Sequence, residues 1–191
     1  MRRITLGLIF AVFLFSQQNG RFASLKSQAF DLFDRGRYSE VAGRLEEVWE
    51  QDHSDARVAE YLAMGYLYGE KDVKKAKALM QESLKAGGLA TFLVQHSHER
   101  GLGLLGSDVM NNYCSGRISV APGKMSFIAD SGDHSATFAA ADLKEFRLPG
   151  NKPGRAEIKS GAKAFIFRVK SDTHAEAALF EDLVNQNLRS K

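Results

Sequence analysis

Cysteine, proline and tryptophan are scarce in this sequence of 191 residues, which holds one, three and one of them. The single cysteine, Cys114, excludes an intramolecular disulfide, so packing must stabilise the fold. No proline lies between Phe22 and Gly87, which leaves this region free to form uninterrupted helices. No apolar run reaches about 20 residues, the length that a membrane-spanning helix requires, so a stable transmembrane segment is not favoured.

A surplus of one charge sign is also missing. Lysine and arginine number 26 against 23 aspartates and glutamates, and the formal net charge is +3. Residues 21–88 carry eleven cations against twelve carboxylates, and residues 89–191 carry thirteen against eleven. A protein that binds nucleic acid through a basic face needs a larger surplus of positive charge. Nucleic acid is therefore not expected as a partner.

The first 20 residues have the order of an export signal. Arg2 and Arg3 precede an apolar-rich run from Ile4 to Phe15, and the polar residues 16–20 follow it. The apolar run has twelve residues, which suits a cleaved signal peptide better than a spanning helix. An uncleaved N-terminal anchor is the alternative. We therefore expect residues 1–20 to be a signal peptide of bacterial type, and the mature protein to be periplasmic or secreted.

Residues 21–88 have the apolar spacing of amphipathic helices. Apolar residues recur at every third and fourth position, and glycines cluster between the periodic runs. Ser54 and Asp72 stand where N-caps belong, and Gly87 with Gly88 supplies a stop after the last helix. The pattern predicts a helical domain over 21–88, with helices at 22–35, 38–52, 55–68 and 72–86.

The helical region repeats itself after 35 residues. The aligned pairs are Leu32 with Leu67, Phe33 with Tyr68, Tyr38 with Val73, Val41 with Ala76, Leu45 with Met80, and Trp49 with Leu84. The run Gly36–Ala42 and the apolar residues after it resemble the turn and second helix of a tetratricopeptide repeat, whose period is about 34 residues. The run Lys71–Ala76 resembles a second copy of the same unit.

This resemblance implies a surface that binds protein, because the first helices of stacked helix pairs line a concave face. The residues that would line this face are Lys26, Phe30, Tyr61 and Tyr68. The alternative is that the aromatic side chains fill the space between the helices. Two repeats are also fewer than the three that a free-standing array needs. We therefore expect the helical domain to pack against the rest of the chain.

Residues 89–191 have a different pattern, in which short apolar runs are divided by turn signals such as Pro122-Gly123 and Gly161-Ala162. A final amphipathic helix is predicted from about His174 to Leu188. The expected fold class is α+β, with a seven-strand antiparallel barrel capped by this helix. The predicted strands are Leu89–His96, Tyr113–Ala121, Lys124–Asp130, His134–Ala139, Leu143–Leu148, Ala156–Ser160 and Lys163–Val169.

Seven strands followed by a C-terminal helix resemble the pleckstrin-homology-like superfold, which includes GRAM domains. The hairpin Gly116–Ile128 and the strands Ala141–Phe146 and Lys163–Arg168 carry the resemblance. The superfold binds lipids, peptides and proteins through different surfaces, so the resemblance implies an interaction module without naming its ligand. The first hairpin has no dense cluster of lysine and arginine, which argues against an inositol-lipid ligand.

Three histidines and the cysteine are candidate metal ligands. His96 and His98 stand two positions apart, so on a strand both imidazoles point to the same side. Cys114 and His134 lie on neighbouring predicted strands, and two or three histidines with a thiolate make a zinc site. Each residue also has an ordinary alternative role, such as a buried thiol or a histidine beside a turn. Zinc at His96, His98, Cys114 and His134 is therefore the alternative function.

Motifs for catalysis and cofactor binding are missing. The run Gly101–Gly106 spells G-x-G-x-x-G, but it lacks the following helix of a dinucleotide site and is interpreted as a loop. The sequence has no nucleophile elbow, no H-E-x-x-H and no phosphate-binding loop. We do not expect an enzyme, and no cofactor is expected apart from zinc on the alternative hypothesis.

Five cations gather around one loop and offer contact with an anionic membrane surface, or form a solvated face: Arg147, Lys152, Arg155, Lys159 and Lys163. The leading hypothesis is an exported, non-enzymatic interaction protein that binds an envelope protein or peptide through its tetratricopeptide-like and pleckstrin-homology-like surfaces. The sequence leaves the partner and the oligomeric state open.

Overall fold

The computed structural model describes residues 20–97, 113–131, 134–148, 154–171 and 173–188. Several residues of interest lie outside these ranges, namely the predicted signal peptide up to residue 19, His98, the run Gly101–Gly106 and Lys152. Within the described ranges, no helix is both long enough and apolar enough to cross a membrane.

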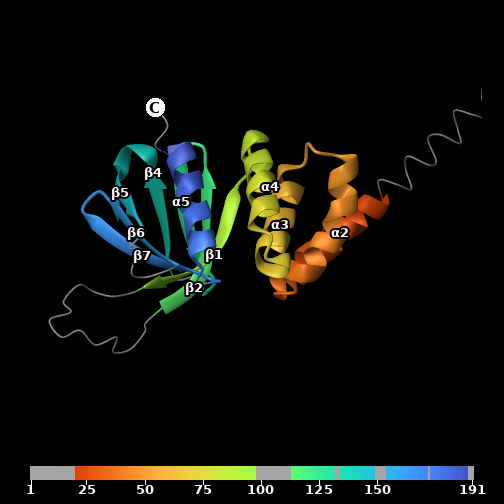
Figure 1. The fold of residues 1–191 in the computed structure, drawn as a ribbon, viewed down its shortest axis with the longest axis horizontal. Helices are drawn as coiled ribbons and strands as arrows, with labels where there is room; N and C mark the ends of the chain where they lie inside the picture. Colours follow the sequence, from red (N-terminus) through yellow and green to blue (C-terminus); the bar gives the residue numbers. More distant parts are fainter. Residues whose placement is uncertain (1–19, 98–112, 132–133, 149–153, 172, 189–191) are drawn as a thin grey trace, which may run out of the picture.

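Four helical segments form the first part of the described chain, as the apolar spacing predicts (Figure 1). A helix over residues 20–34 is followed by α2 (Tyr38–Gln51), α3 (Ala56–Met64) and α4 (Val73–Lys85). A π-helical turn, η1 (Gly65–Glu70), extends α3. A side chain at Gly69 would place its Cβ 2.4 Å from the backbone nitrogen of Ser39, so glycine is needed for η1 to pack against α2.

The predicted caps are right for α4 and wrong for α3. Asp72 caps α4, since its carboxylate accepts hydrogen bonds from the amides of Lys74 and Lys75. For α3 the cap is Asp55 rather than Ser54. Ser54 lies one residue too early, and both its amide and its hydroxyl donate to Asp52 instead.

The second part of the described chain is a seven-stranded antiparallel sheet in the order β4-β3-β2-β1-β7-β6-β5. Its alternating burial follows the period of two that the sequence predicts. A C-terminal helix, α5 (His174–Leu188), follows as expected. The strands are β1 (Ala90–Ser97), β2 (Tyr113–Ala121), β3 (Lys124–Ala129), β4 (Ser135–Ala139), β5 (Leu143–Arg147), β6 (Arg155–Ser160) and β7 (Lys163–Val169).

The sheet is not the closed barrel that the sequence analysis expects. β4 and β5 are consecutive in the chain, joined by the short turn η2 (Ala140–Asp142), yet they stand at opposite ends of the strand order. Helix α5 contacts β5 at one end of the sheet and β2 and β3 toward the other. Its Phe180 ring lies 5.0 Å from Phe92 and 5.1 Å from Phe146. Helix α5 therefore packs against both parts of the sheet, and its apolar side completes the core.

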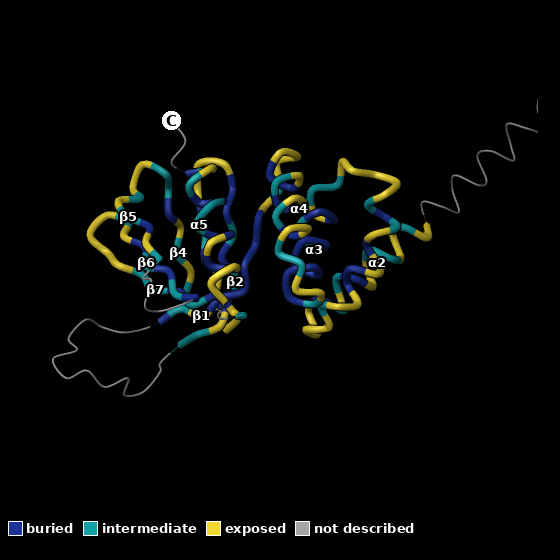
Figure 2. The backbone as a smooth tube through the Cα atoms, in the orientation of Figure 1, coloured by how far each residue is buried: buried dark blue, intermediate teal, exposed yellow. Residues whose placement is uncertain are grey.

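The helical part and the sheet share one continuous core, which Figure 2 shows as buried backbone in both parts. A buried hydrogen-bond chain joins them: the Tyr68 hydroxyl donates to Glu176 of α5 at 2.6 Å and accepts from the Leu93 amide of β1 at 2.7 Å. Thr91 of β1 donates to Glu60 of α3 at 2.6 Å. The helical part thus packs against the sheet.

Candidate metal centre

Three of the four predicted metal ligands come together on one face of the sheet. His96 of β1 and Cys114 of β2 are direct cross-strand partners. They share the face that carries the buried Phe92 and Ile118, because alternate residues of a strand point to the same side. His134 stands just before β4, where its carbonyl oxygen accepts a hydrogen bond from the amide of Ala129 and closes the β3–β4 hairpin.

The ligand atoms of these residues converge. The Cys114 sulfur lies 3.0 Å from Nε2 of His134 and 3.9 Å from Nδ1 of His96. All three ligand atoms lie within 4.8 Å of one another. In a tetrahedral zinc site, bond lengths of about 2.3 Å to sulfur and 2.0 Å to nitrogen place the two ligand atoms about 3.5 Å apart. The two observed separations lie on either side of this value, so small side-chain rotations would complete the geometry.

Aromatic rings form the wall behind these three residues. The His96 ring lies 5.1 Å from Phe167 and 5.2 Å from Phe127 between centroids. Gly116 makes room for the Phe127 ring, because a Cβ at this position would stand 2.6 Å from it. Such a wall restricts the imidazole rotamers and lowers the local dielectric, which strengthens an interaction between a thiolate and a cation.

The electrostatic surroundings keep the Cys114 thiol protonated at neutral pH. Burial raises its pKa above the usual value, and the carboxylate of Asp130 adds to the effect. A coordinating metal ion reverses this balance, since its charge removes the proton from the thiol outright. All three candidate ligands are half-buried, so the centre is shielded without being closed to solvent. His98, the fourth predicted ligand, lies outside the described residues.

The residues predicted to line a helical groove have different positions. Phe30 and Tyr61 stack with their ring centroids 4.4 Å apart, which places the 20–34 helix beside α3. Lys26 forms an ion pair of 2.7 Å with Asp55 at the start of α3. Tyr68, however, is buried, and its hydroxyl bonds within the protein, so the prediction that it lines an exposed groove is wrong. The alternative, that an aromatic fills the space between elements, holds for Tyr68.

Among the loop cations that the structure describes, three are paired with carboxylates: Arg147, Arg155 and Lys159. Arg147 and Arg155 both contact Glu157, and Lys159 lies 2.5 Å from Glu145. These pairs offset much of the positive charge that the sequence places around the loop. Charged residues alternate along both strands, since Glu145 precedes Arg147 by two positions and Glu157 stands between Arg155 and Lys159, so the sequence carried a signal for this pairing.

The aromatic wall behind the three candidate ligands and the stacking of Arg57 were not predicted from the sequence. Phe165 and Phe167 alternate along β7, and this period of two is the signal that could have placed both on the face that carries His96 and Cys114. The Arg57 guanidinium lies 4.2 Å from the Phe30 ring centroid. An isolated arginine in a helix carries no signal for such a contact.

No protein-family model matches the sequence, and no curated protein matches it. Among solved structures, the chain is similar to the N-terminal PH domain of human ARAP2 protein, with 14% identity and a TM-score of 0.37 over 55% of this chain and 87% of that one. It is also similar to the C-terminal domain of an unknown protein from Leishmania infantum, with 11% identity and a TM-score of 0.34 over 49% and 81%. Both TM-scores lie below 0.5, so neither likeness assigns a fold family or a function.

Proposed function

We propose that this protein binds a zinc ion through His96, Cys114 and His134. The observation that carries the proposal is the convergence of the three ligand atoms within 4.8 Å, on residues separated by 18 and 20 positions in the chain. One thiolate and two imidazoles form a donor set that suits zinc. We propose metal binding as the role of this cluster.

The position of the cluster suggests what the ion does. It would join β1, β2 and the start of β4, three strands on one side of the open sheet. A metal bound only by the folded chain stabilises that fold by mass action. Coordination would also protect the single thiol, Cys114, from oxidation, since we propose that the protein is exported to an oxidising compartment.

The experiment is elemental analysis of the mature protein, purified without a histidine tag or chelator, followed by cobalt(II) substitution. We expect close to one zinc per chain, and a cobalt(II) form with the near-ultraviolet absorption of a thiolate complex. Both signals should be lost in Cys114→Ser and His134→Asn and kept in His174→Asn, whose histidine is exposed at the start of α5. Metal-free protein that takes up neither ion, or an unchanged cobalt spectrum in Cys114→Ser, would refute the proposal.

A second function is favoured by a separate observation on the helices. Arg57 stacks on Phe30 beside Tyr61, and the Lys26–Asp55 pair lies along the same two helices. We propose that this half-exposed aromatic and charged face binds an envelope protein or peptide, in line with the tetratricopeptide-like spacing. The pleckstrin-homology-like strand order of the sheet is consistent with such an interaction module.

The test is affinity purification of partners from a periplasmic extract, with wild type and variants compared side by side. A partner retained by wild type and by Arg35→Ala, but lost on Phe30→Ala and on Arg57→Ala, would support this face. A partner set that is identical for all four proteins would refute it. N-terminal sequencing of the exported chain tests the signal peptide independently, since cleavage near residue 20 is expected.

A further inference from the structure

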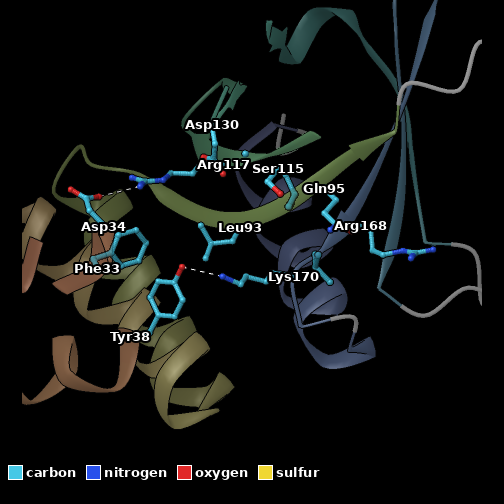
Figure 3. A pocket seen from close by; sticks show the side chains of 13 residues that line it. Phe33, Asp34, Tyr38, Leu93, Gln95, Ser115, Arg117, Asp130, Arg168 and Lys170 are labelled. Carbon is cyan, nitrogen blue, oxygen red and sulfur yellow. Dashed lines mark hydrogen bonds and ion pairs between the residues drawn. The ribbon is translucent and has the colours of Figure 1, made fainter. Parts of the chain in front are cut away.

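A cleft lies between the helical part and the face of the sheet opposite the metal centre (Figure 3). Its cavity has a volume of about 460 Å³ and is lined by the end of the 20–34 helix, the start of α2 and strands β1, β2 and β7. We call it the seam cleft. Leu93 lies at its floor, and β1 alternates, so Leu93 faces away from His96. The seam cleft and the metal centre are therefore separate sites on the two faces of one strand.

Two cations are held in place over aromatic rings in the seam cleft. The Arg117 guanidinium lies 5.0 Å from the Phe33 ring centroid and 3.2 Å from the carboxylate of Asp34. The Lys170 ammonium lies 4.7 Å from the Tyr38 ring centroid and donates to its hydroxyl at 3.1 Å. Figure 3 shows Arg117 and Lys170 on either side of Leu93. Stacking leaves most of their N–H donors available, since a guanidinium has five and an ammonium three.

The ion pair between Arg117 and Asp34 is weak, so it leaves the positive charge of Arg117 available to a ligand. Its side chains are 38% and 64% exposed, and ion pairs with such exposure contribute little to stability. A carboxylate that enters the cleft can therefore replace Asp34 on Arg117 at low cost, and gains Lys170 as a second donor.

A second cavity of about 350 Å³ continues the cleft across the sheet and shares Arg117 and Asp130 with it. This cavity contains Leu89 and Ile128, which are 36% and 62% exposed. They are the two exposed large apolar side chains among the described residues. Because both side chains line the same cavity, an apolar group that enters it would remove their exposed surface from water, which is favourable.

We propose that the seam cleft and its continuation bind an extended acidic peptide. A carboxylate side chain of the peptide lies between Arg117 and Lys170, and a neighbouring large apolar side chain covers Leu89 and Ile128. Strand addition beside Leu93 is not the binding mode, because residues 94–96 of β1 are paired with β2 on one side and with β7 on the other. Recognition thus rests on side chains, with the anion read by two stacked cations.

The probes are short N-acetylated, C-amidated peptides that carry one glutamate and one leucine separated by one, two or three glycines, each with a glutamine-for-glutamate twin. Binding is followed by amide chemical shifts of the isotope-labelled mature protein. We expect saturable shifts at the amides of Leu93, Arg117 and Lys170 with at least one glutamate peptide. The glutamine twin should bind about tenfold more weakly, the factor expected for one charged hydrogen bond.

The variants Arg117→Gln and Lys170→Gln should each weaken the glutamate peptide by about tenfold, while Lys163→Gln, an exposed lysine of β7 outside the cleft, leaves it unchanged. Two variants on different elements guard against a local folding defect in one of them. The proposal is overturned if no glutamate peptide binds, if the glutamine twins bind equally well, or if acetate alone produces the same shifts with the same affinity. The last result would indicate an isolated anion site.

Discussion

Replacing Tyr68 with phenylalanine should weaken the junction between the helices and the sheet. The phenol oxygen donates to Glu176 at 2.6 Å and accepts from the buried amide of Leu93 at 2.7 Å, so the substitution removes both bonds. A buried amide without an acceptor costs about 1–3 kcal/mol, and a lost hydrogen bond to a carboxylate costs about 1.5–3 kcal/mol. Glu176 keeps the amide and hydroxyl of Ser171 as donors, which limits the second loss.

We therefore expect Tyr68→Phe to lower the free energy of unfolding by about 3 kcal/mol. For a chain of this size, that loss lowers the melting temperature by about 6–12 °C. The assay is urea and thermal unfolding, followed by circular dichroism, of the mature protein. Tyr61→Phe is the matched control, because Tyr61 packs through its ring against Phe30 and Phe33. A loss below about 1 kcal/mol, or one equal to that of the control, would refute the role assigned to the hydroxyl.

Three further predictions concern pH, packing and capping. Burial raises the pKa of Glu176 above its usual 4.5, so as pH rises past 4.5 the folded state keeps a proton that the unfolded state releases, and the contribution of this group to stability falls. Glu176→Gln should remove that contribution, so the free energy of unfolding in urea should fall less steeply with pH than in wild type, and an equal slope would contradict this role of Glu176. Gly116→Ala should cost about 1–3 kcal/mol in thermal unfolding, because the new Cβ would stand 2.6 Å from the Phe127 ring; an unchanged melting temperature would contradict the packing described. Asp55→Ala should lower the free energy of unfolding by about 1 kcal/mol and Ser54→Ala by less than about 0.5 kcal/mol, measured by chemical denaturation. The opposite order would indicate that Ser54 is the cap of α3.

Local patterns predicted the elements of this fold well. The period of two and the turn pairs Pro122-Gly123 and Gly161-Ala162 locate the hairpins β2–β3 and β6–β7 as the structure has them. The open sheet could not be predicted in this way. Whether the end strands β4 and β5 pair depends on how α5 packs on the sheet. The contacts of α5 join residues that are far apart in sequence, such as Phe180 and Phe92.

The candidate metal centre was partly predictable, because neighbouring antiparallel strands bring His96 and Cys114 into register once the strand limits are known. The position of His134 depends on how the β3–β4 hairpin closes, which the sequence indicated only by a turn. Tyr68 shows the opposite case. Its position in the helical pattern suggested that Tyr68 lines an exposed groove. Its hydrogen-bond partner Glu176 follows 108 residues later, and no local pattern predicts such a bond.

The most direct test of the metal centre is thermal unfolding of the metal-stripped mature protein with and without an excess of zinc, for wild type, Cys114→Ser and His174→Asn. We predict that zinc raises the melting temperature of wild type and of His174→Asn, since it binds only the folded state, and leaves that of Cys114→Ser unchanged. If zinc does not raise the melting temperature of wild type, or raises that of Cys114→Ser to the same extent, then His96, Cys114 and His134 do not form a zinc site.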